Sequence, residues 1–229
     1  MLKKYVRATS VIAVVAVAFV TSFAGAASAA TSPVINAVKT NSSASGPVVV
    51  AIGDSILMGH GLGSNKSWVA QLAVQDNFDL VNLASDGSGF VTAGDNNDTF
   101  ADQIMVAIDL KANVVILSGS SNDLGQSDPA IEAATDAAVT ELHSALPNAQ
   151  VIAVSGIWGD TAVPEQLRTI NEAVETAVTA AGGTYLRIGQ PLSGRVALMQ
   201  DDDVHPTATG QTLIAQRVQK ALNRAGDTL

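Results

Sequence analysis

The chain has 229 residues, no cysteine, and 21 acidic against 12 basic side chains, which give a formal net charge of −9 at pH 7. Without cysteine it can hold neither a disulfide nor a lipid-modified cysteine anchor. So acidic a chain repels phosphate backbones and anionic lipid, which argues against nucleic acids and acidic membrane surfaces as partners.

Residues 1–30 are typical of a secretory signal peptide. Three basic residues precede an unbroken apolar core at 11–20, and residues 27–29 read Ala-Ser-Ala, a small-residue cleavage site. An uncleaved membrane anchor is the competing interpretation, because Thr21 and Ser22 extend the stretch towards spanning length. The short core favours cleavage, and we expect a secreted protein without stable membrane insertion.

Cleavage would leave 199 residues with a net charge of −12, since residues 1–30 carry three positive charges and no negative ones. That length predicts a single domain with a core of its own, and we expect a monomer. Residues 31–46 are rich in Thr, Ser, Asn and Pro and predict a loose linker. The domain is then expected to occupy residues 47–229.

Five short apolar stretches alternate with amphipathic segments along this domain. The helix signals are clearest around Asp128 at an N-cap, Pro129 at N1 and a stop at Pro147. Strands that are apolar throughout and alternate with helices form parallel sheets covered on both faces. The sequence therefore predicts an α/β fold, a flavodoxin-like three-layer α/β/α sandwich with strand order 2-1-3-4-5. The expected strands are residues 48–52, 78–83, 113–117, 151–154 and 184–188.

Polar turns follow the first three expected strands, and a fourth polar segment precedes the last helix. The first turn, Gly53-Asp54-Ser55, ends a buried strand abruptly, and in open α/β sheets the carboxyl ends of the strands form the binding site. Taken alone, Asp54 or Ser55 is most simply the N-cap of the next helix. The other segments are residues 85–89, 118–123 and 201–206.

Together these segments contain the parts that acyl transfer to serine requires. The Ser55 hydroxyl needs a base and the base needs an orienting carboxylate, which His205 and Asp202, three residues apart, can supply. The developing oxyanion needs donors fixed in advance. The backbone N–H groups of Ser55 and Gly87 and the side-chain amide of Asn122 are the candidates.

Four motifs, in this order along nearly the whole expected mature chain, resemble the conserved blocks of the SGNH (GDSL-type) hydrolase superfamily. The resemblance implies that Ser55 is the nucleophile and first oxyanion donor, that Gly87 and Asn122 complete the oxyanion hole, that His205 is the base and that Asp202 is its partner. It also implies a flavodoxin-like sandwich. The motifs are Gly53-Asp54-Ser55, Gly87, Ser120-Ser121-Asn122-Asp123 and Asp202-x-x-His205-Pro206.

Two positions depart from the family pattern, and some roles have rivals. Ile56 stands where the first block has leucine, an apolar packing position, and Ser120 stands where the third block has glycine. Gly89 competes with Gly87, and either glycine can be a plain turn residue. Asp201 and Asp203 compete with Asp202, although the three-residue offset from the histidine favours Asp202.

Other residues are weaker candidates. His143 falls in the middle of a predicted helix, where a solvated face is its ordinary position. His60 is close to Ser55 in sequence and is expected at the pocket rim, but no carboxylate stands at a spacing that would orient it. Ser88 is a rival nucleophile, but no expected strand ends directly before it. Asn122 alone can be a local turn-former.

The sequence thus predicts a secreted serine esterase that acts on a small-molecule or polysaccharide ester without a cofactor. Few aromatic side chains are available, with Trp158 and the region of Phe90 as the main apolar walls, which favours short acyl groups. A carbohydrate or peptidoglycan O-acetyl esterase, or an acyltransferase, is the main alternative. A metal-dependent hydrolase using residues 201–203 and His205 fits poorly, because one histidine and consecutive aspartates make a poor zinc site. A non-catalytic binding module remains possible on any fold.

Overall fold

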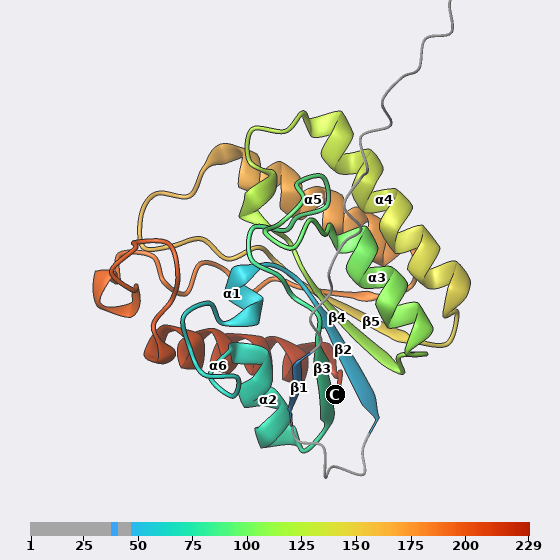
Figure 1. The fold of residues 1–229 in the computed structure, drawn as a ribbon, viewed down its shortest axis with the longest axis horizontal. Helices are drawn as coiled ribbons and strands as arrows, with labels where there is room; N and C mark the ends of the chain where they lie inside the picture. The colour runs from blue at the N-terminus through green and yellow to red at the C-terminus, as the bar shows by residue number, and fades with distance from the viewer. Residues whose placement is uncertain (1–37, 41–46) are drawn as a thin grey trace, which may run out of the picture. The chain divides into compact units, whose positions relative to one another are not determined.

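The computed structural model describes residues 38–40 and 47–229 (Figure 1). The expected signal peptide and most of the expected linker lie outside the described residues. Six strands form one sheet in the order β1-β3-β2-β4-β5-β6. The strands are β1 (Val38–Thr40), β2 (Val48–Ile52), β3 (Asp79–Asn82), β4 (Val114–Ser118), β5 (Gln150–Val154) and β6 (Thr184–Leu186).

The five strands from β2 to β6 run parallel, and their spatial order confirms the predicted 2-1-3-4-5 arrangement. The sixth strand differs from the expectation. β1 pairs antiparallel with β3 at the edge of the sheet, with Val38 opposite Asn82, inside the range expected to be a linker. The sequence does not predict β1, because a strand of three residues that pairs on one side has no apolar run and too few positions for an alternating pattern.

Helices cover both faces of the sheet, so the predicted three-layer sandwich is confirmed (Figure 1). The helices are α1 (Ser55–Met58), α2 (Trp68–Asp76), α3 (Phe100–Asp109), α4 (Asp128–Ala145), α5 (Glu165–Ala180) and α6 (Ala208–Ala225). Two short 3₁₀ turns lie at Ser121–Asp123 and Val196–Leu198. Among these described helices, none is long and apolar enough to cross a membrane.

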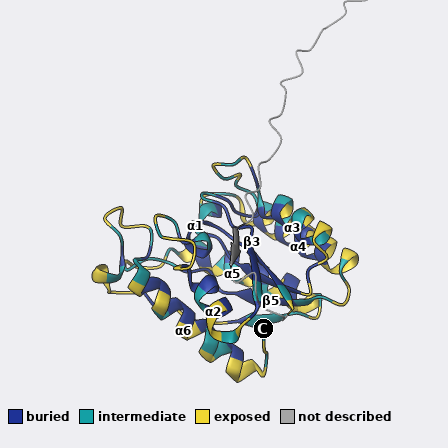
Figure 2. Ribbon diagram, turned by 60° about the horizontal axis from the view of Figure 1, so that its bottom comes forward, coloured by how far each residue is buried: buried dark blue, intermediate teal, exposed yellow. Residues whose placement is uncertain are grey.

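The core divides between the two faces because successive side chains of a strand point to opposite sides. Val49 and Ala51 of β2 pack on the face that α1, α2 and α6 cover, while Val50 and Ile52 pack on the face of α3, α4 and α5. All five residues of β4 are buried. Figure 2 shows buried residues along the sheet and exposed residues on the outer helix surfaces.

Helix starts follow the expected capping chemistry within one residue. Ser67 caps α2, and its Oγ accepts a hydrogen bond from the Ala70 N–H at 3.3 Å. At α4 the N-cap is Ser127 and not Asp128, which becomes the first helical residue before Pro129. A one-residue shift of this kind is ordinary at helix ends, where the last backbone groups are only partly bonded.

The strand register places the polar turns at one edge of the sheet. Ile52 at the end of β2 pairs with Leu117 near the end of β4, so Gly53 leaves the sheet beside Ser118, the last residue of β4. β3 ends next to β2, and Ser85 N–H donates to the Gly53 carbonyl at 3.1 Å. The first three predicted site loops therefore meet at the carboxyl edge.

Candidate active site

Ser55 is the first residue of α1, and its neighbour Asp54 provides the helix cap. Asp54 Oδ1 accepts a hydrogen bond from the Ile56 N–H at 3.0 Å, so the capping duty that Ser55 was a candidate for falls to Asp54. Gly53 has no room for a side chain, because a Cβ there would meet Leu57 Cδ1 at 2.7 Å. The Ser55 hydroxyl is left without a structural task among the described residues.

Asp54 also joins two of the predicted motifs. Its second oxygen, Oδ2, accepts a hydrogen bond from Ser120 Oγ at 2.9 Å. Burial raises the pKa of Asp54, while the hydrogen bonds from Ser120 and Ile56 and the nearby charge of His205 act in the opposite direction. Ser120, which stands where the family pattern has glycine, therefore fixes the turn before Ser55.

His205 and Asp202 form the pair that their spacing predicts. His205 Nδ1 lies 2.7 Å from Asp202 Oδ2, and Asp202 Oδ1 accepts hydrogen bonds from the backbone N–H groups of His205 at 2.9 Å and Val204 at 3.0 Å. The backbone hydrogen bond from His205, followed by the imidazole, holds the pKa of Asp202 well below its usual range. An ionised carboxylate only accepts hydrogen bonds, so in the neutral form of His205 the proton is on Nδ1 and Nε2 keeps its lone pair.

The chain links between α1 and the histidine loop bring Ser55 and His205 into one neighbourhood. The Ser55 carbonyl accepts a hydrogen bond from the His60 N–H at 3.0 Å, and the His60 ring stacks on the His205 ring with centroids 4.0 Å apart. Gln211 of α6 donates through Nε2 to the Ile56 carbonyl at 2.8 Å. Residues about 150 positions apart in the sequence therefore meet at the N-terminus of α1.

Gly87 and Gly89 must be glycine for different structural reasons. Gly87 has φ of +74°, a left-handed conformation that favours glycine. Gly89 is required by close approach, because a Cβ there would lie 2.5 Å from Asp123 Oδ1. Within the described residues, neither the Gly87 N–H nor the Ser55 N–H has a hydrogen-bond acceptor.

Asn122 lies in the 3₁₀ turn after β4 with its amide partly used. Asn122 Nδ2 donates to the Ser88 carbonyl at 2.9 Å, and its backbone N–H donates to Ser120 Oγ at 3.1 Å. A primary amide has two N–H donors, so one remains for another acceptor. The bond to Ser88 also fixes the direction of the amide, which a local turn-former would not need.

Ser88 is not a nucleophile. It is fully buried, and its single hydroxyl proton is shared between the Ser85 carbonyl at 2.8 Å and the Gly53 carbonyl at 3.1 Å. Its oxygen also accepts a hydrogen bond from Gln103 Nε2 at 3.1 Å. Ser88 therefore joins the first two site loops to each other.

Gln103 is a site-supporting residue that the sequence reading missed. It lies on the buried face of α3, where its Oε1 accepts from the Gly53 N–H at 2.9 Å and its Nε2 donates to Ser88 Oγ and, at 3.0 Å, to Asp98 Oδ2. The available signal was a polar residue among the apolar positions Phe100 and Ile104 of an amphipathic helix.

Replacing Gln103 with leucine is expected to lower the free energy of unfolding by about 2–4 kcal/mol, because the buried Gly53 N–H and the Asp98 carboxylate would lose their partner. Urea denaturation followed by circular dichroism measures the change. The exposed Gln75 on α2 offers a control, since Gln75→Leu removes no buried hydrogen bond. Equal stability of the Gln103→Leu and wild-type proteins would contradict this role.

Asp123 is the second missed residue, although it belongs to a recognised motif. Its buried carboxylate accepts hydrogen bonds from three successive backbone N–H groups, those of Phe90, Val91 and Thr92, at 2.7, 3.0 and 2.9 Å. A carboxylate with three such donors fixes the loop that carries Gly87. Its only sequence signal was its place beside Asn122.

His60 has a carboxylate partner, so the expectation that none orients it was wrong. His60 Nδ1 lies 2.7 Å from Asp86 Oδ2. The partner is 26 residues away, in the loop that follows β3, and a search for nearby spacings in the sequence cannot find it. His143, in contrast, is exposed on α4 as expected.

His60, Asp202 and His205 each offer a ligand atom within 4.8 Å of the others, the one such cluster in the described part of the chain. Within it, His205 Nδ1 and Asp202 Oδ2 already share a hydrogen bond, and His60 Nδ1 is held by Asp86. Neither Asp201 nor Asp203 takes part. Because a carboxylate occupies each Nδ1, a metal ion at this cluster would have to use the Nε2 atoms of the two rings.

One of the two side chains expected to form apolar walls of the site lies in the core instead. Phe90 is buried and packs edge to face on Phe100, with ring centroids 4.9 Å apart, so it is part of the core. Trp158 remains partly exposed, and its Nε1 donates to Thr161 Oγ1 at 3.0 Å. Of the two expected apolar walls, Trp158 is therefore the one that keeps exposed surface.

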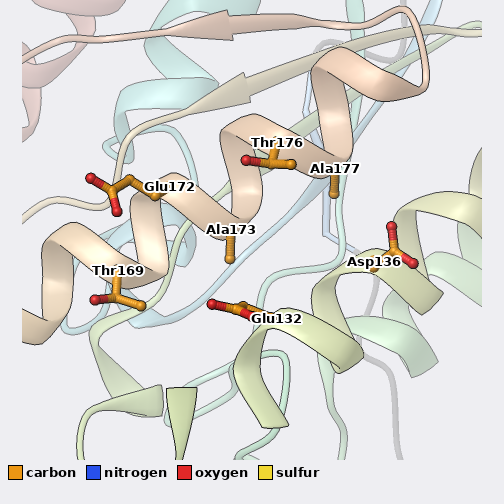
Figure 3. Close-up of a pocket in the computed structure, with 7 residues that line it drawn as sticks. All are labelled: Glu132, Asp136, Thr169, Glu172, Ala173, Thr176 and Ala177. Carbon is orange, nitrogen blue, oxygen red and sulfur yellow. The ribbon is translucent and has the colours of Figure 1, made fainter. Parts of the chain in front are cut away.

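A separate groove of about 400 Å³ lies between α4 and α5, away from all the predicted site residues (Figure 3). Three carboxylates line it, from Glu132 and Asp136 of α4 and Glu172 of α5. Glu172 is paired with Arg168 at 2.8 Å. None of the predicted site residues lines the groove.

Comparisons with known proteins identify the family and the fold. A family model described as the GDSL-like lipase/acylhydrolase family matches residues 51–213, the segment from β2 to α6. No curated protein sequence matches the chain.

Three solved structures illustrate the shared fold. The psychrotrophic esterase EstA from Pseudoalteromonas sp., inhibited by monoethylphosphonate, is 16% identical with a TM-score of 0.61, over 79% of this chain and 98% of that one. A family two carbohydrate esterase from Clostridium thermocellum in complex with cellohexaose is 18% identical with a TM-score of 0.60, over 79% and 65%. The salicylyl-acyltransferase SsfX3 from a tetracycline biosynthetic pathway is 20% identical with a TM-score of 0.60, over 80% and 56%.

The family match runs from the end of β2, the strand before Ser55, into the first part of α6, the helix after His205. The resemblance first visible in four short motifs is thereby confirmed. By this match and by its fold, the chain belongs to the GDSL-like lipase/acylhydrolase family of esterases and related hydrolases.

Proposed function

We propose that the protein is a secreted serine esterase that hydrolyses carboxylic esters with short acyl groups through an acyl-enzyme on Ser55. The observation that carries the proposal is the pairing of His205 Nδ1 with Asp202 Oδ2 at 2.7 Å, in a loop that contacts the turn carrying Ser55. The expected signal peptide supports secretion.

In the first half of the reaction, Ser55 Oγ bonds to the carbonyl carbon of the ester while its proton passes to His205 Nε2. Asp202 keeps the imidazole in the tautomer that can accept this proton and stabilises the imidazolium that results. The carbonyl oxygen becomes an oxyanion, which the N–H groups of Ser55 and Gly87 and the free N–H of Asn122 are proposed to bind. The alcohol leaves with the proton from His205, and the acyl group stays on Ser55.

In the second half, water takes the place of the alcohol. His205 Nε2 accepts a proton from the water as its oxygen bonds to the acyl carbon, and the same donors bind the second oxyanion. Collapse of this intermediate breaks the bond to Ser55, which regains its proton from His205. The carboxylic acid is released and the free enzyme returns.

A short acyl group is proposed because few apolar walls are available. Phe90 is withdrawn into the core, and Trp158 alone remains of the large side chains expected there. Removal or transfer of acetyl groups on a carbohydrate is the second candidate, because the fold is shared with a carbohydrate esterase and an acyltransferase. That candidate uses the same residues and changes only the acceptor or the alcohol.

The proposal predicts stoichiometric labelling of Ser55 by an organophosphonate, with loss of p-nitrophenyl acetate hydrolysis in proportion. Mass spectrometry of the labelled peptide locates the adduct, and EDTA serves as a control that should leave turnover unchanged. A panel of esters of increasing acyl length, together with acetylated xylan, separates the two candidate substrates. Labelling at another residue, or turnover that survives full labelling, would contradict the proposal.

A further inference from the structure

The His60–Asp86 pair is built like the Asp202–His205 pair and lies directly against it. Each imidazole has its Nδ1 at 2.7 Å from one carboxylate oxygen. The two rings stack with centroids 4.0 Å apart and an angle of 24° between their planes. One face of the His205 ring is therefore covered by a second ring whose own direction is fixed by a carboxylate.

The pair connects three loops of the site. The His60 N–H donates to the Ser55 carbonyl at 3.0 Å, so the stacked ring is tied to the turn of the proposed nucleophile. Asp86 is the residue immediately before Gly87, in the proposed oxyanion loop. His205 belongs to the loop before α6.

Gln200 fixes the backbone on both sides of the stack. Its Nε2 donates to the His60 carbonyl at 2.8 Å and to the Pro206 carbonyl at 2.9 Å. Its backbone N–H donates to the His205 carbonyl at 2.7 Å. The chain segments that carry the two rings are thus held at a fixed separation by one side chain.

His205 needs such a support because its other contact constrains it only in part. A single hydrogen bond at Nδ1 sets the tautomer and one edge of the ring, but the ring can still tilt about that bond. Asp202 is itself 42% exposed and belongs to the same loop, so it moves with His205. A neighbour on the ring face removes the remaining freedom, as preorganised sites require.

We propose that His60 is a positioning residue for His205, and that Asp86 holds His60 in the orientation that stacks. The inference rests on the proposed function, because it assigns His205 the role of base. His60 touches neither of the reacting atoms in this account. It keeps Nε2 of His205 directed at Ser55. Through its hydrogen bond with Asp86, it also links the orientation of the His205 ring to the proposed oxyanion loop.

The test compares His60→Ala, His60→Phe and Asp86→Ala with His143→Ala, which removes an exposed imidazole from α4. His60→Ala is expected to lower kcat for p-nitrophenyl acetate by about 10- to 100-fold, with KM within about twofold, because a small misplacement of a catalytic group has effects of this size. Asp86→Ala is expected to lower kcat by a smaller factor. His60→Phe keeps a flat ring against His205 and is expected to recover most of the loss.

A double-mutant cycle shows whether His60 acts through His205. If it does, adding His60→Ala to a His205→Ala protein causes no further loss of the residual turnover. A further loss by the single-mutant factor would overturn the proposal, as would a wild-type kcat for His60→Ala. If His60→Ala does not fold, by circular dichroism and thermal melting, the Phe variant decides: a folded His60→Phe protein with a 100-fold loss overturns the role of the stack.

Failure of the proposed function has a different signature in the same experiment. If His205→Ala keeps wild-type turnover, His205 is not the base, whatever effect the His60 substitutions have. Loss of turnover in His205→Ala with none in His60→Ala would leave the esterase proposal intact and reject only the positioning role.

Discussion

Replacing Ser55 with alanine is expected to lower kcat for p-nitrophenyl acetate by about 10³- to 10⁶-fold while the protein stays folded. The hydroxyl is the only group proposed to bond to the acyl carbon, and no remaining side chain in the site can take its place. Ser88 is close in sequence, but it is fully buried with its hydroxyl directed at the Ser85 and Gly53 carbonyls. The residual rate would reflect oxyanion binding and substrate positioning alone.

Folding of the Ser55→Ala protein should be unchanged, since Asp54 caps α1 and Ser55 contributes only its backbone. Circular dichroism and thermal melting check this directly. Ser144→Ala, an exposed change on α4, is the matched control and should keep full activity. Turnover by Ser55→Ala within a few-fold of wild type would remove the nucleophile from the mechanism.

Replacing His205 with alanine is expected to lower kcat by about 10³- to 10⁶-fold, comparable to the loss of the nucleophile, because the two act as a unit. Without the imidazole, no group accepts the Ser55 proton or returns it to the leaving alcohol. A protein with both substitutions should be no slower than either single variant. Additive losses would show that the two residues act separately.

The pH dependence of the wild-type protein gives a second measurement of the same role. The hydrogen bonds from His205 hold the pKa of Asp202 far below its usual range, so this carboxylate stays ionised throughout the working range. A group with a depressed pKa loses its stabilising interaction only as the pH falls through that depressed value. A fall in kcat/KM at acid pH is therefore expected to come from a group other than Asp202, and the proposed base His205 is the group to test.

In the His205→Ala protein, the residual rate should no longer fall at acid pH. The Asp202→Asn protein should be slower than wild type, and its rate should still fall at acid pH. Stopped-assay rates from pH 5 to 9, with thermal melting at each pH, distinguish catalysis from unfolding. An unchanged acid limb in His205→Ala would assign the titration to another group.

The parallel sheet was predictable because its strands are continuous apolar runs. A run such as residues 48–52 is buried on both faces, and alternation with amphipathic helices leaves few arrangements for such strands. The helix caps were predictable for a similar reason, since the chemistry of Ser67 is local. β1 escaped prediction because an edge strand of three residues is specified by its partner β3 rather than by its own sequence.

The same distinction holds at the site. Asp202 and His205 are three residues apart, so their hydrogen bond follows from one turn of chain. The contacts of His60 with Asp86, and of Gln103 with Gly53, join residues 26 and 50 positions apart. Such pairs depend on the strand order and the register, which fix side-chain distances only after the sheet has formed.

The hydrogen bonds of Gln211 have a consequence for when the enzyme becomes active. This side chain of α6 accepts from the Trp68 N–H and donates to the Ile56 carbonyl, both at 2.8 Å. A chain that emerges from the ribosome N-terminus first has its serine long before it has α6. The turn that carries Ser55 is therefore expected to be held in its described position only once the final helix has docked.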